Sequence, residues 1–317
     1  MQYTMDLTKL HLVYFANVHT PDLCDLYLKV FKKKVKPSYF TNKYGLNDDH
    51  HKQCSTVAMM GNEVVGFFGC ISQEFLDHRR KTTVSLCHVC DFILLEPYRG
   101  KGVFDLLYKH TLDRVVDDQY EIMFGLQSDQ TYKFCKRMGW EDGRSFNRFQ
   151  IVFRKEKVAK IQAKLVGEQK MLERVTKALQ PYILNAEMDQ FNLFKDSFSR
   201  KYDGLFLSEK GASHQRFLVL IENTVMWLKF DGRLVAGMIR FLDDFDAAKF
   251  QTSLHQILRP TGIYDLTFHV QHSTNEHQQL SSFLEEKESF NVSFIRTYED
   301  GCHVDELALN FMDADVF

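Results

Sequence analysis

The segment from residue 94 to residue 104 carries the residue types that could bind an anion. It reads Leu-Leu-Glu-Pro-Tyr-Arg-Gly-Lys-Gly-Val-Phe, so an apolar stretch leads into two glycines interleaved with Arg99 and Lys101. Gly100 and Gly102 lack a Cβ, so the backbone can take positive φ there and approach a ligand closely. A helix is expected to start directly afterwards, and its first N–H groups and dipole favour negative charge. The spacing therefore predicts a phosphate-binding loop.

The pattern differs from two other phosphate loops, because no Gly-Lys-Ser/Thr follows and the third glycine of a dinucleotide fingerprint is missing. Pro97 to Gly102 instead resembles the pyrophosphate loop of the GCN5-related N-acetyltransferase (GNAT) superfamily, which binds acetyl-coenzyme A. The segment Phe134 to Trp140 resembles the second motif of that family, a short helix that ends at a glycine followed by an aromatic residue. The alternative is a surface turn in which the arginine and lysine are incidental.

The resemblance implies a GNAT fold, of α/β (α+β) class, with a mixed, mostly antiparallel sheet in which two parallel strands splay apart. Residues 93–95 and 124–126 would belong to these two strands, and acetyl-CoA would lie in the opening between them. Phe104 departs from the family pattern, which has a small residue at that place. By the resemblance, the cofactor-binding residues are Ile93, Leu94, Leu95, Tyr98, Arg99, Gly100, Lys101, Gly102, Val103 and Phe104.

The reaction that the resemblance implies is attack of a primary amine on the thioester carbonyl of acetyl-CoA, which needs a way to remove a proton from the amine. We expect Asp91 to act as the base, because it is a carboxylate inside an otherwise apolar strand just before the loop. His88 is the second choice, and a solvated site without a single base is a third. Alternatively, Asp91 only hydrogen-bonds a neighbouring loop, as a strand bulge there would allow.

The leaving thiolate could take its proton from a side chain of the second motif. The tyrosine that the family usually has there falls on Cys135, which is a second departure from the pattern. A thiol could donate a proton, although a buried cysteine on a helix more often only packs. Tyr132, one helical turn earlier, could supply a phenol instead. The expected catalytic residues are therefore Asp91, Tyr132 and Cys135.

The cysteines do not predict a metal site. Cys87-His88-Val89-Cys90 has the spacing of half a zinc site, but it lies in an expected strand, and no second cysteine pair exists. The seven cysteines are an odd number spread through apolar stretches, as expected of reduced, buried thiols. We therefore expect structural cysteines and no bound metal.

Composition narrows the function classes. The chain has 317 residues, of which 44% are hydrophobic, and 40 Lys and Arg stand against 42 Asp and Glu. This near-neutral balance makes nucleic acid an unexpected partner. Residues 1–6 show no basic segment followed by an apolar core, so we expect no signal peptide, and no apolar run reaches the ~18 residues that span a bilayer. We expect a cytoplasmic protein without a membrane partner; a homodimer is left open.

The chain is long enough for two domains. A long charged helix is expected over residues 154–179, and the domain junction is placed at its start. This gives a GNAT acetyltransferase domain at 1–155 and a second domain at 156–317.

The second domain repeats parts of the first. Tyr120–Gln127 is echoed by Tyr264–Gln271, and the hairpin at Gly61 is echoed by one at Asp231. Positions 61 and 120 are 120 − 61 = 59 apart, whereas positions 231 and 264 are 264 − 231 = 33 apart. The 59 − 33 = 26 missing positions correspond to about one strand and a pyrophosphate loop. We therefore expect a degenerate GNAT-like copy that does not bind coenzyme A; an unrelated α/β domain is the alternative.

The acceptor is expected to be a small primary amine, because the near-neutral charge gives no field for a highly charged partner. Residues 39–44 loosely resemble a segment of a GNAT subgroup that acts on amino sugars, although Asn42 replaces the tryptophan of that segment. An amino sugar is thus suggested by analogy alone. The rival function is a non-catalytic acetyl-CoA-binding regulatory module, since Cys135 could indicate a lost acid.

Overall fold

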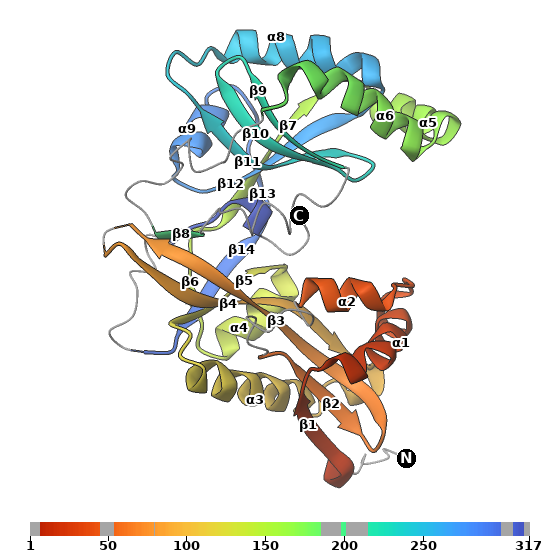
Figure 1. Ribbon diagram of the computed structural model, residues 1–317, viewed down its shortest axis with the longest axis vertical. Helices are drawn as coiled ribbons and strands as arrows, with labels where there is room; N and C mark the ends of the chain where they lie inside the picture. Colours follow the sequence, from red (N-terminus) through yellow and green to blue (C-terminus); the bar gives the residue numbers. More distant parts are fainter. Residues whose placement is uncertain are drawn as a thin grey trace. The chain divides into compact units, whose positions relative to one another are not determined.

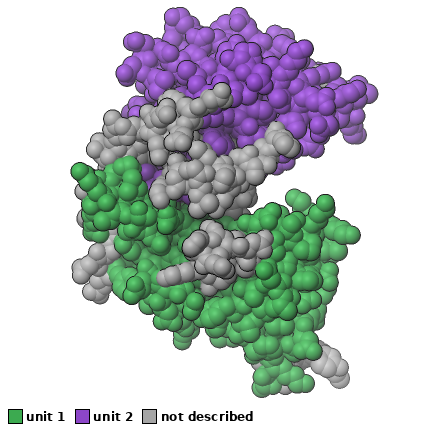
Figure 2. Space-filling model, in the orientation of Figure 1, with its two compact units in different colours: residues 1–142, 292–304 green, residues 143–291, 305–317 purple. Residues whose placement is uncertain are grey.

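The computed structural model describes residues 7–44, 54–78, 80–184, 198–200, 215–298 and 307–313. It divides into two compact units, which Figure 2 distinguishes by colour. Unit 1 consists of residues 1–142 and 292–304, and unit 2 of residues 143–291 and 305–317. Within the described ranges, no helix is long and apolar enough to cross a membrane.

Unit 1 is built on one mixed sheet (Figure 1). The first four strands pair antiparallel in chain order, and β4 then pairs parallel with β5. Gly61, at φ 60°, lies in the turn between β2 and β3, which confirms the hairpin expected there. In sheet order the strands are β1 (Leu10–Tyr14), β2 (Thr56–Met60), β3 (Glu63–Asp77), β4 (Thr82–Leu94), β5 (Ile122–Gln127), β14 (Asn291–Arg296) and β6 (Glu141–Asp142).

Helices cover both faces of this sheet, which explains why β3 and β4 are apolar almost throughout. Successive strand residues point to opposite faces, so Ile93 joins the apolar cluster under α1 and α2, whereas Leu94 joins the cluster under α3 and α4. The helices are α1 (Thr20–Phe31), α2 (Pro37–Lys43), α3 (Val103–Asp117) and α4 (Asp129–Arg137).

The parallel strands β4 and β5 pair over only part of their length. The ladder runs from Leu86–Ile122 to Val89–Gly125, whereas β4 continues to Leu94. On the other side of β4, Gly69 pairs with Asp91 and Cys70 pairs with Val89, so Cys90 is an extra residue in a β-bulge. The expected splayed pair is thus confirmed, and it opens directly at the bulge.

Unit 2 has its own mixed sheet and its own apolar core. Its helices are α5 (Glu156–Val166), α6 (Glu168–Leu179), α8 (Ala247–Leu258) and α9 (Asn275–Ser281). In sheet order its strands are β13 (Lys287–Glu288), β7 (Phe146–Val152), β12 (Asp265–Gln271), β11 (Leu234–Phe241), β10 (Thr224–Phe230) and β9 (Arg216–Ile221). Two short strands, β8 (Phe198–Arg200) and β15 (Leu307–Ala308), pair parallel with each other and do not belong to this sheet.

The prediction of a single helix over residues 154–179 is wrong. The chain forms α5 and α6, separated by Gly167 at φ 81°. A residue with positive φ cannot continue a right-handed helix, and glycine adopts that conformation readily.

Relative to the junction expected between residues 155 and 156, one strand from each side belongs to the sheet of the other unit. β7, which follows unit 1 in the chain, pairs with β12 in the sheet of unit 2. β14, which follows most of unit 2, lies between β5 and β6 in the sheet of unit 1. The expected junction between residues 155 and 156 therefore does not coincide with the division into units, because residues 143–155 belong to unit 2 and residues 292–304 to unit 1.

Unit 2 repeats the central topology of unit 1. β10 and β11 form an antiparallel hairpin, and α8 connects β11 to the parallel strand β12. This ladder also ends at a bulge, because the last pair is Ala236–Phe268 and Gly237 is the extra residue. β12 therefore occupies the place of β5, as the echo of Tyr120–Gln127 by Tyr264–Gln271 predicts.

The expected equivalence of the hairpins at Gly61 and Asp231 is wrong. The turn at Asp231 joins β10 to β11, which correspond to β3 and β4 rather than to β2 and β3. No strand is missing from this part of the repeat. The interval from Asp231 to Tyr264 is shorter because it starts one strand later and contains β11, with 8 residues, whereas the interval from Gly61 to Tyr120 contains both β3 and β4, with 15 and 13 residues.

The exchange predicts that residues 1–142 do not fold alone. This fragment lacks β14, whose residues Val292, Ser293 and Phe294 are all at most 2% exposed. We expect no cooperative thermal unfolding transition by circular dichroism for the fragment. A fragment to which residues 291–298 are joined through a flexible linker should show a cooperative transition. The same fragment with Phe294→Asp in the added segment should not. A cooperative transition in the bare fragment would contradict this prediction.

Candidate functional site

The glycine-rich loop connects the free end of β4 to the start of α3. After Leu94 the chain makes a short 3₁₀ turn, Glu96–Tyr98, and Gly102 then precedes the first residue of α3. Gly100 and Gly102 have φ values of 71° and 78°, which confirms the positive φ expected from the sequence.

The N-terminus of α3 is open to a ligand. No side chain caps this helix, so its first N–H groups are not satisfied by a capping side chain. A Cβ built on Gly100 or Gly102 would meet no atom within 4 Å, so the space in front of the loop is clear. Arg99 and Lys101 are exposed beside it. The loop thus has the donors, the dipole and the charge that a phosphate requires.

Backbone groups of β4 line the gap beside β5. The Leu95 N–H donates to the Val65 carbonyl at 3.0 Å, so Leu95 faces β3, and in an antiparallel ladder Leu94 must then face the other way. By the same alternation, the backbone N–H and C=O of Phe92 also point toward the gap, whereas those of Ile93 point toward β3. Of the three strand residues expected to hold the cofactor, only Leu94 presents its backbone there, and the sequence analysis missed Phe92.

Arg99 lies across the mouth of this gap. Its Nε donates a hydrogen bond to the Leu94 carbonyl at 3.1 Å. This contact positions the guanidinium between the end of β4 and the loop. Tyr98 is buried beneath the loop and packs in the core with Val103.

Phe104 packs inward, so the bulky residue does not block the loop. Its ring stacks on Phe92 at 5.1 Å between centroids and meets Phe134 edge-on at 4.8 Å. Arg137 lies over the other side of this contact, 5.2 Å from the Phe134 ring, and pairs with Asp105 at 2.6 Å. The aromatic cluster and this ion pair join α4 to the first turn of α3.

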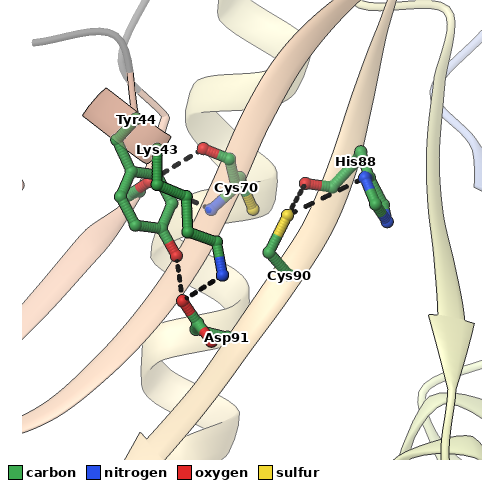
Figure 3. A network of polar contacts seen from close by, with 7 residues as sticks. Lys43, Tyr44, Cys70, His88, Cys90 and Asp91 are labelled. Carbon is green, nitrogen blue, oxygen red and sulfur yellow. Dashed lines mark hydrogen bonds and ion pairs between the residues drawn. The ribbon is translucent and has the colours of Figure 1, made fainter. Parts of the chain in front are cut away.

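Asp91 lies on the opposite face of the sheet, where it is held by α2 and the residue that follows it. Lys43 Nζ pairs with Asp91 Oδ2 at 2.8 Å, and the Tyr44 hydroxyl donates to the same oxygen at 2.5 Å. The Lys43 and Asp91 side chains are only 9% and 14% exposed. Figure 3 shows Lys43 and Tyr44 both pointing at this carboxylate, while Cys90 points toward His88. The bulge expected as an alternative is therefore present.

The second oxygen of Asp91, Oδ1, has no hydrogen-bond partner among the residues that the structure describes, because both donors bind Oδ2. The two contacts orient the carboxylate through Oδ2 and leave Oδ1 without a donor from the described residues.

His88 is not accessible. It is 1% exposed, its ring stacks on Phe124 at 4.7 Å, and its Nδ1 lies 3.2 Å from the Gln73 amide nitrogen. A base must reach the proton that it removes, so this position does not suit the second choice made from the sequence.

Cys135 is a core residue. It has no exposed surface, and the Gln127 side-chain amide donates to its sulfur at 2.9 Å. Burial raises the pKa of the Cys135 thiol to about 12. A thiol that holds its proton so firmly is a poor acid for another thiolate, so packing accounts for this residue.

Tyr132 donates its phenol proton to Asp142 Oδ1 at 2.6 Å, and this hydrogen bond raises the pKa of Tyr132. Lys136 also binds that oxygen, at 3.1 Å. The structure therefore brings neither Tyr132 nor Cys135 into position as an evident acid for a leaving thiolate.

Gln127, at the end of β5, makes a contact that sequence reasoning missed. Besides the bond to Cys135, it accepts a hydrogen bond from Ser293 at 2.7 Å. A buried glutamine at the end of an apolar strand was the only signal, and its partner Ser293 is 166 positions away in the sequence. The contact ties β5 and α4 to the exchanged strand β14.

A family model matches the N-terminal part of the chain. Residues 20–140 match the model of the Acetyltransferase (GNAT) family, a range that extends from the start of α1 to the residue after Gly139 and includes both sequence motifs. Residues 20–140 form a GNAT acetyltransferase domain. The match supports an acyltransferase activity for this domain.

Solved structures show that the fold extends beyond this domain. A GCN5-related N-acetyltransferase from Kribbella flavida is 14% identical, with 91% of this chain and 72% of that chain covered and a TM-score of 0.57. A probable N-acyltransferase from Enterococcus faecalis V583 is 10% identical over 92% and 73% of the two chains, with a TM-score of 0.59. A tandem GNAT protein from the clavulanic acid biosynthesis pathway is 11% identical over 92% and 99%, with a TM-score of 0.54. No curated protein matches this chain.

In the described part of unit 2, the helix that corresponds to α3 begins differently. There, Asp246 precedes α8, and its carboxylate accepts hydrogen bonds from the N–H groups of Ala248 and Lys249 at 3.0 and 3.1 Å. These bonds lower the pKa of Asp246. The chain's own anion thus occupies the helix N-terminus that the GNAT domain leaves open.

Replacing Gly102 with alanine should abolish stabilisation by acetyl-CoA, because a Cβ would enter the open space before α3. At about 100-fold excess over the dissociation constant, acetyl-CoA should stabilise the native protein by about 2.7 kcal/mol, seen as a rise in Tm. Gly61→Ala is the matched control, since Gly61 also has positive φ and open space around it but lies at the β2–β3 turn. Both variants should lose about 1–2 kcal/mol from backbone strain. If Gly102→Ala keeps the full rise in Tm, the loop does not hold the ligand.

Proposed function

We propose that the GNAT domain transfers the acetyl group of acetyl-CoA to a primary amine of a small molecule. The observation that carries this proposal is the gap that opens between β4 and β5 at Val89–Gly125, directly beside the uncapped N-terminus of α3. The loop would bind the pyrophosphate, and the backbone groups of Phe92 and Leu94 would bind the amide-bearing arm as an added strand would. Domain membership supports the reaction class, and the ligand is our inference.

The reaction forms one amide bond and breaks one thioester bond. The amine nitrogen attacks the carbonyl carbon, the carbon–sulfur bond breaks, and coenzyme A leaves as a thiolate that takes up a proton. The amine must lose a proton during this sequence. The β4 backbone and the loop would fix the thioester, so that attack becomes effectively unimolecular.

Asp91 is the group best suited to take that proton. Lys43 and Tyr44 orient the carboxylate through Oδ2, which leaves Oδ1 as the oxygen that an acceptor amine or a bridging water could reach. The bulge at Cys90 places Asp91 on the α2 face, beside the last paired residues of the splayed strands.

The leaving thiolate would be protonated by water. Cys135 is buried with a raised pKa, and the Tyr132 proton is bound to Asp142. Positioning of the thioester and the amine then supplies most of the rate, with Asp91 as the one side chain that handles a proton.

The acceptor is proposed to be small, and an amino sugar is our specific suggestion. α2 presents Tyr39, Lys43 and Tyr44 close together, with Lys43 Nζ 5.7 Å from the centre of each ring. These residues lie in the segment that resembles the amino-sugar subgroup. The free thiols in the described part of the chain also fit a reducing, cytoplasmic setting.

A regulatory module that binds acetyl-CoA without turnover is the second candidate. The observation in its favour is that Tyr132 and Cys135 are both engaged in the protein's own contacts. It shares the cofactor site with the first candidate and differs only in the fate of the thioester.

A screen of amines distinguishes these two functions. The purified chain is incubated with acetyl-CoA and single amines, including amino sugars, and released thiol is followed by a colorimetric reagent. We expect amine-dependent thiol release and an acetylated product by mass spectrometry, with at least one amino sugar among the acceptors. A rise in Tm with acetyl-CoA but no release with any amine would favour the binding module.

Asp91→Asn should lower kcat/KM by about 100-fold or more and leave the acetyl-CoA-dependent rise in Tm intact, as expected for a lost general base. Because Lys43 would lose its buried partner, stability can fall by about 3–5 kcal/mol. Lys43→Met is the matched control, since it breaks the same pair but keeps the carboxylate. The double variant removes the unpaired charge and should be as slow as Asp91→Asn. Equal activity in Asp91→Asn and the wild type would exclude Asp91 as the base.

A further inference from the structure

Three side chains of unit 2 converge although they come from separate segments. His272 follows β12, His277 lies in α9, and Glu286 directly precedes β13. One ligand atom from each residue lies within 4.8 Å of the other two. The two imidazole rings are 4.6 Å apart between centroids, at an interplanar angle of 65°.

The backbone around this cluster is fixed. The His272 N–H donates to the Ser145 carbonyl at 2.8 Å, which continues the pairing of β12 with β7. Thr274 caps α9, and its hydroxyl accepts a hydrogen bond from the His277 N–H at 3.1 Å. Glu286 is anchored by β13, which pairs with the same strand β7. All three side chains are therefore carried by hydrogen-bonded structure.

His277 supplies the observation that points to a ligand. Its side chain is 9% exposed, and its buried Nε2 has no hydrogen-bond partner among the described residues. Nε2 faces Glu286 Oε2 at 3.2 Å, in a geometry that does not form a hydrogen bond. A buried nitrogen without a partner loses its hydration without compensation unless something else binds it.

Glu286 is itself oriented by a neighbour. The Asn147 side-chain amide of β7 donates to Glu286 Oε1, so that Oε2 is the oxygen directed at His277. Phe149, two residues along β7, meets the His277 ring edge-on at 5.6 Å. Metal ligands are commonly held by outer partners of this kind.

We propose that His272, His277 and Glu286 bind one divalent transition-metal ion, with Zn²⁺ as the reference ion. Two imidazole nitrogens and one carboxylate oxygen are a donor set that zinc accepts, and a fourth position remains for water or an external ligand. Mg²⁺ and Ca²⁺ prefer oxygen donors alone and should bind poorly. The ion would join the end of β12, α9 and the start of β13.

The sequence analysis expected no metal, since it considered only the cysteines. The three ligands are neither a known spacing motif nor adjacent in the chain, because Glu286 lies nine positions after His277. The site lies wholly in unit 2, so it is independent of the proposed acetyl transfer. The competing account is a plain ion pair between His277 and Glu286 with no affinity for metal.

The test uses the untagged, chelator-treated full-length protein. Zn²⁺ alone is titrated by isothermal calorimetry, and Co²⁺ is added separately to record its visible absorption. We expect one equivalent of Zn²⁺ to bind and Co²⁺ to give the intense bands of a four-coordinate site. Mg²⁺ should give neither heat nor competition. Binding of Zn²⁺ should also raise Tm, which reports the joined segments.

Variants identify the ligands. His272→Gln and Glu286→Gln change exposed side chains, so the fold should persist, as a circular dichroism melt verifies. Loss of a residue that only hydrogen-bonds a metal ligand weakens metal binding by about 10- to 100-fold. Each of these two variants should weaken Zn²⁺ binding by more than that. Glu285→Gln, one position away with an 81% exposed side chain, should bind like the wild type. Absence of a stoichiometric Zn²⁺ complex, or equal affinity in all three variants, would overturn the proposal.

Discussion

The separation of two parallel strands is the constraint on which the GNAT domain depends. β4 and β5 pair only as far as Val89–Gly125, because the extra residue Cys90 disrupts the ladder at that point. The same bulge sets the direction of the residues that follow. Phe92 then turns its backbone toward the gap while Asp91 points to the α2 face. One inserted residue thus creates both the opening for a ligand and the placement of the carboxylate beside it.

A comparison of the two units shows how the strand geometry and the start of the following helix each affect whether an anion could bind. Unit 2 also has a bulge, at Gly237, directly after its last parallel pair. Its helix α8, however, is preceded by Asp246, whose carboxylate accepts hydrogen bonds from N–H groups of the first turn, whereas Gly102 offers no side chain to cap α3. A splayed strand pair is therefore not sufficient for an anion site. The residue before the helix decides whether the donors are available to a ligand.

The sequence predicted what depends on neighbours along the chain. The loop, its glycines at positive φ and the hairpin at Gly61 follow from local conformation. It could not predict contacts that depend on distant pairing. Lys43 reaches Asp91 across 48 positions, and Ser293 reaches Gln127 across 166, so no local pattern signals either contact. The misplaced junction has the same cause, because a strand pattern does not say which sheet the strand joins.

The exchanged strands also explain why a second unit without an open loop is retained in the chain. β14 is an interior strand of the GNAT sheet, with Ser293 fully buried and bonded to Gln127, and the chain reaches it only after passing through unit 2. The six-stranded sheet of unit 2, in contrast, lies wholly within the continuous segment 143–291. The sheet of unit 1 therefore requires a segment that lies beyond most of unit 2 in sequence, whereas the sheet of unit 2 requires none from beyond unit 1. Asp246 caps α8 in unit 2, where α3 of unit 1 has no side-chain cap, but loss of unit 2 itself would remove the chain connection that delivers β14. Unit 2 provides this connection to β14 whether or not it also contributes to acceptor binding.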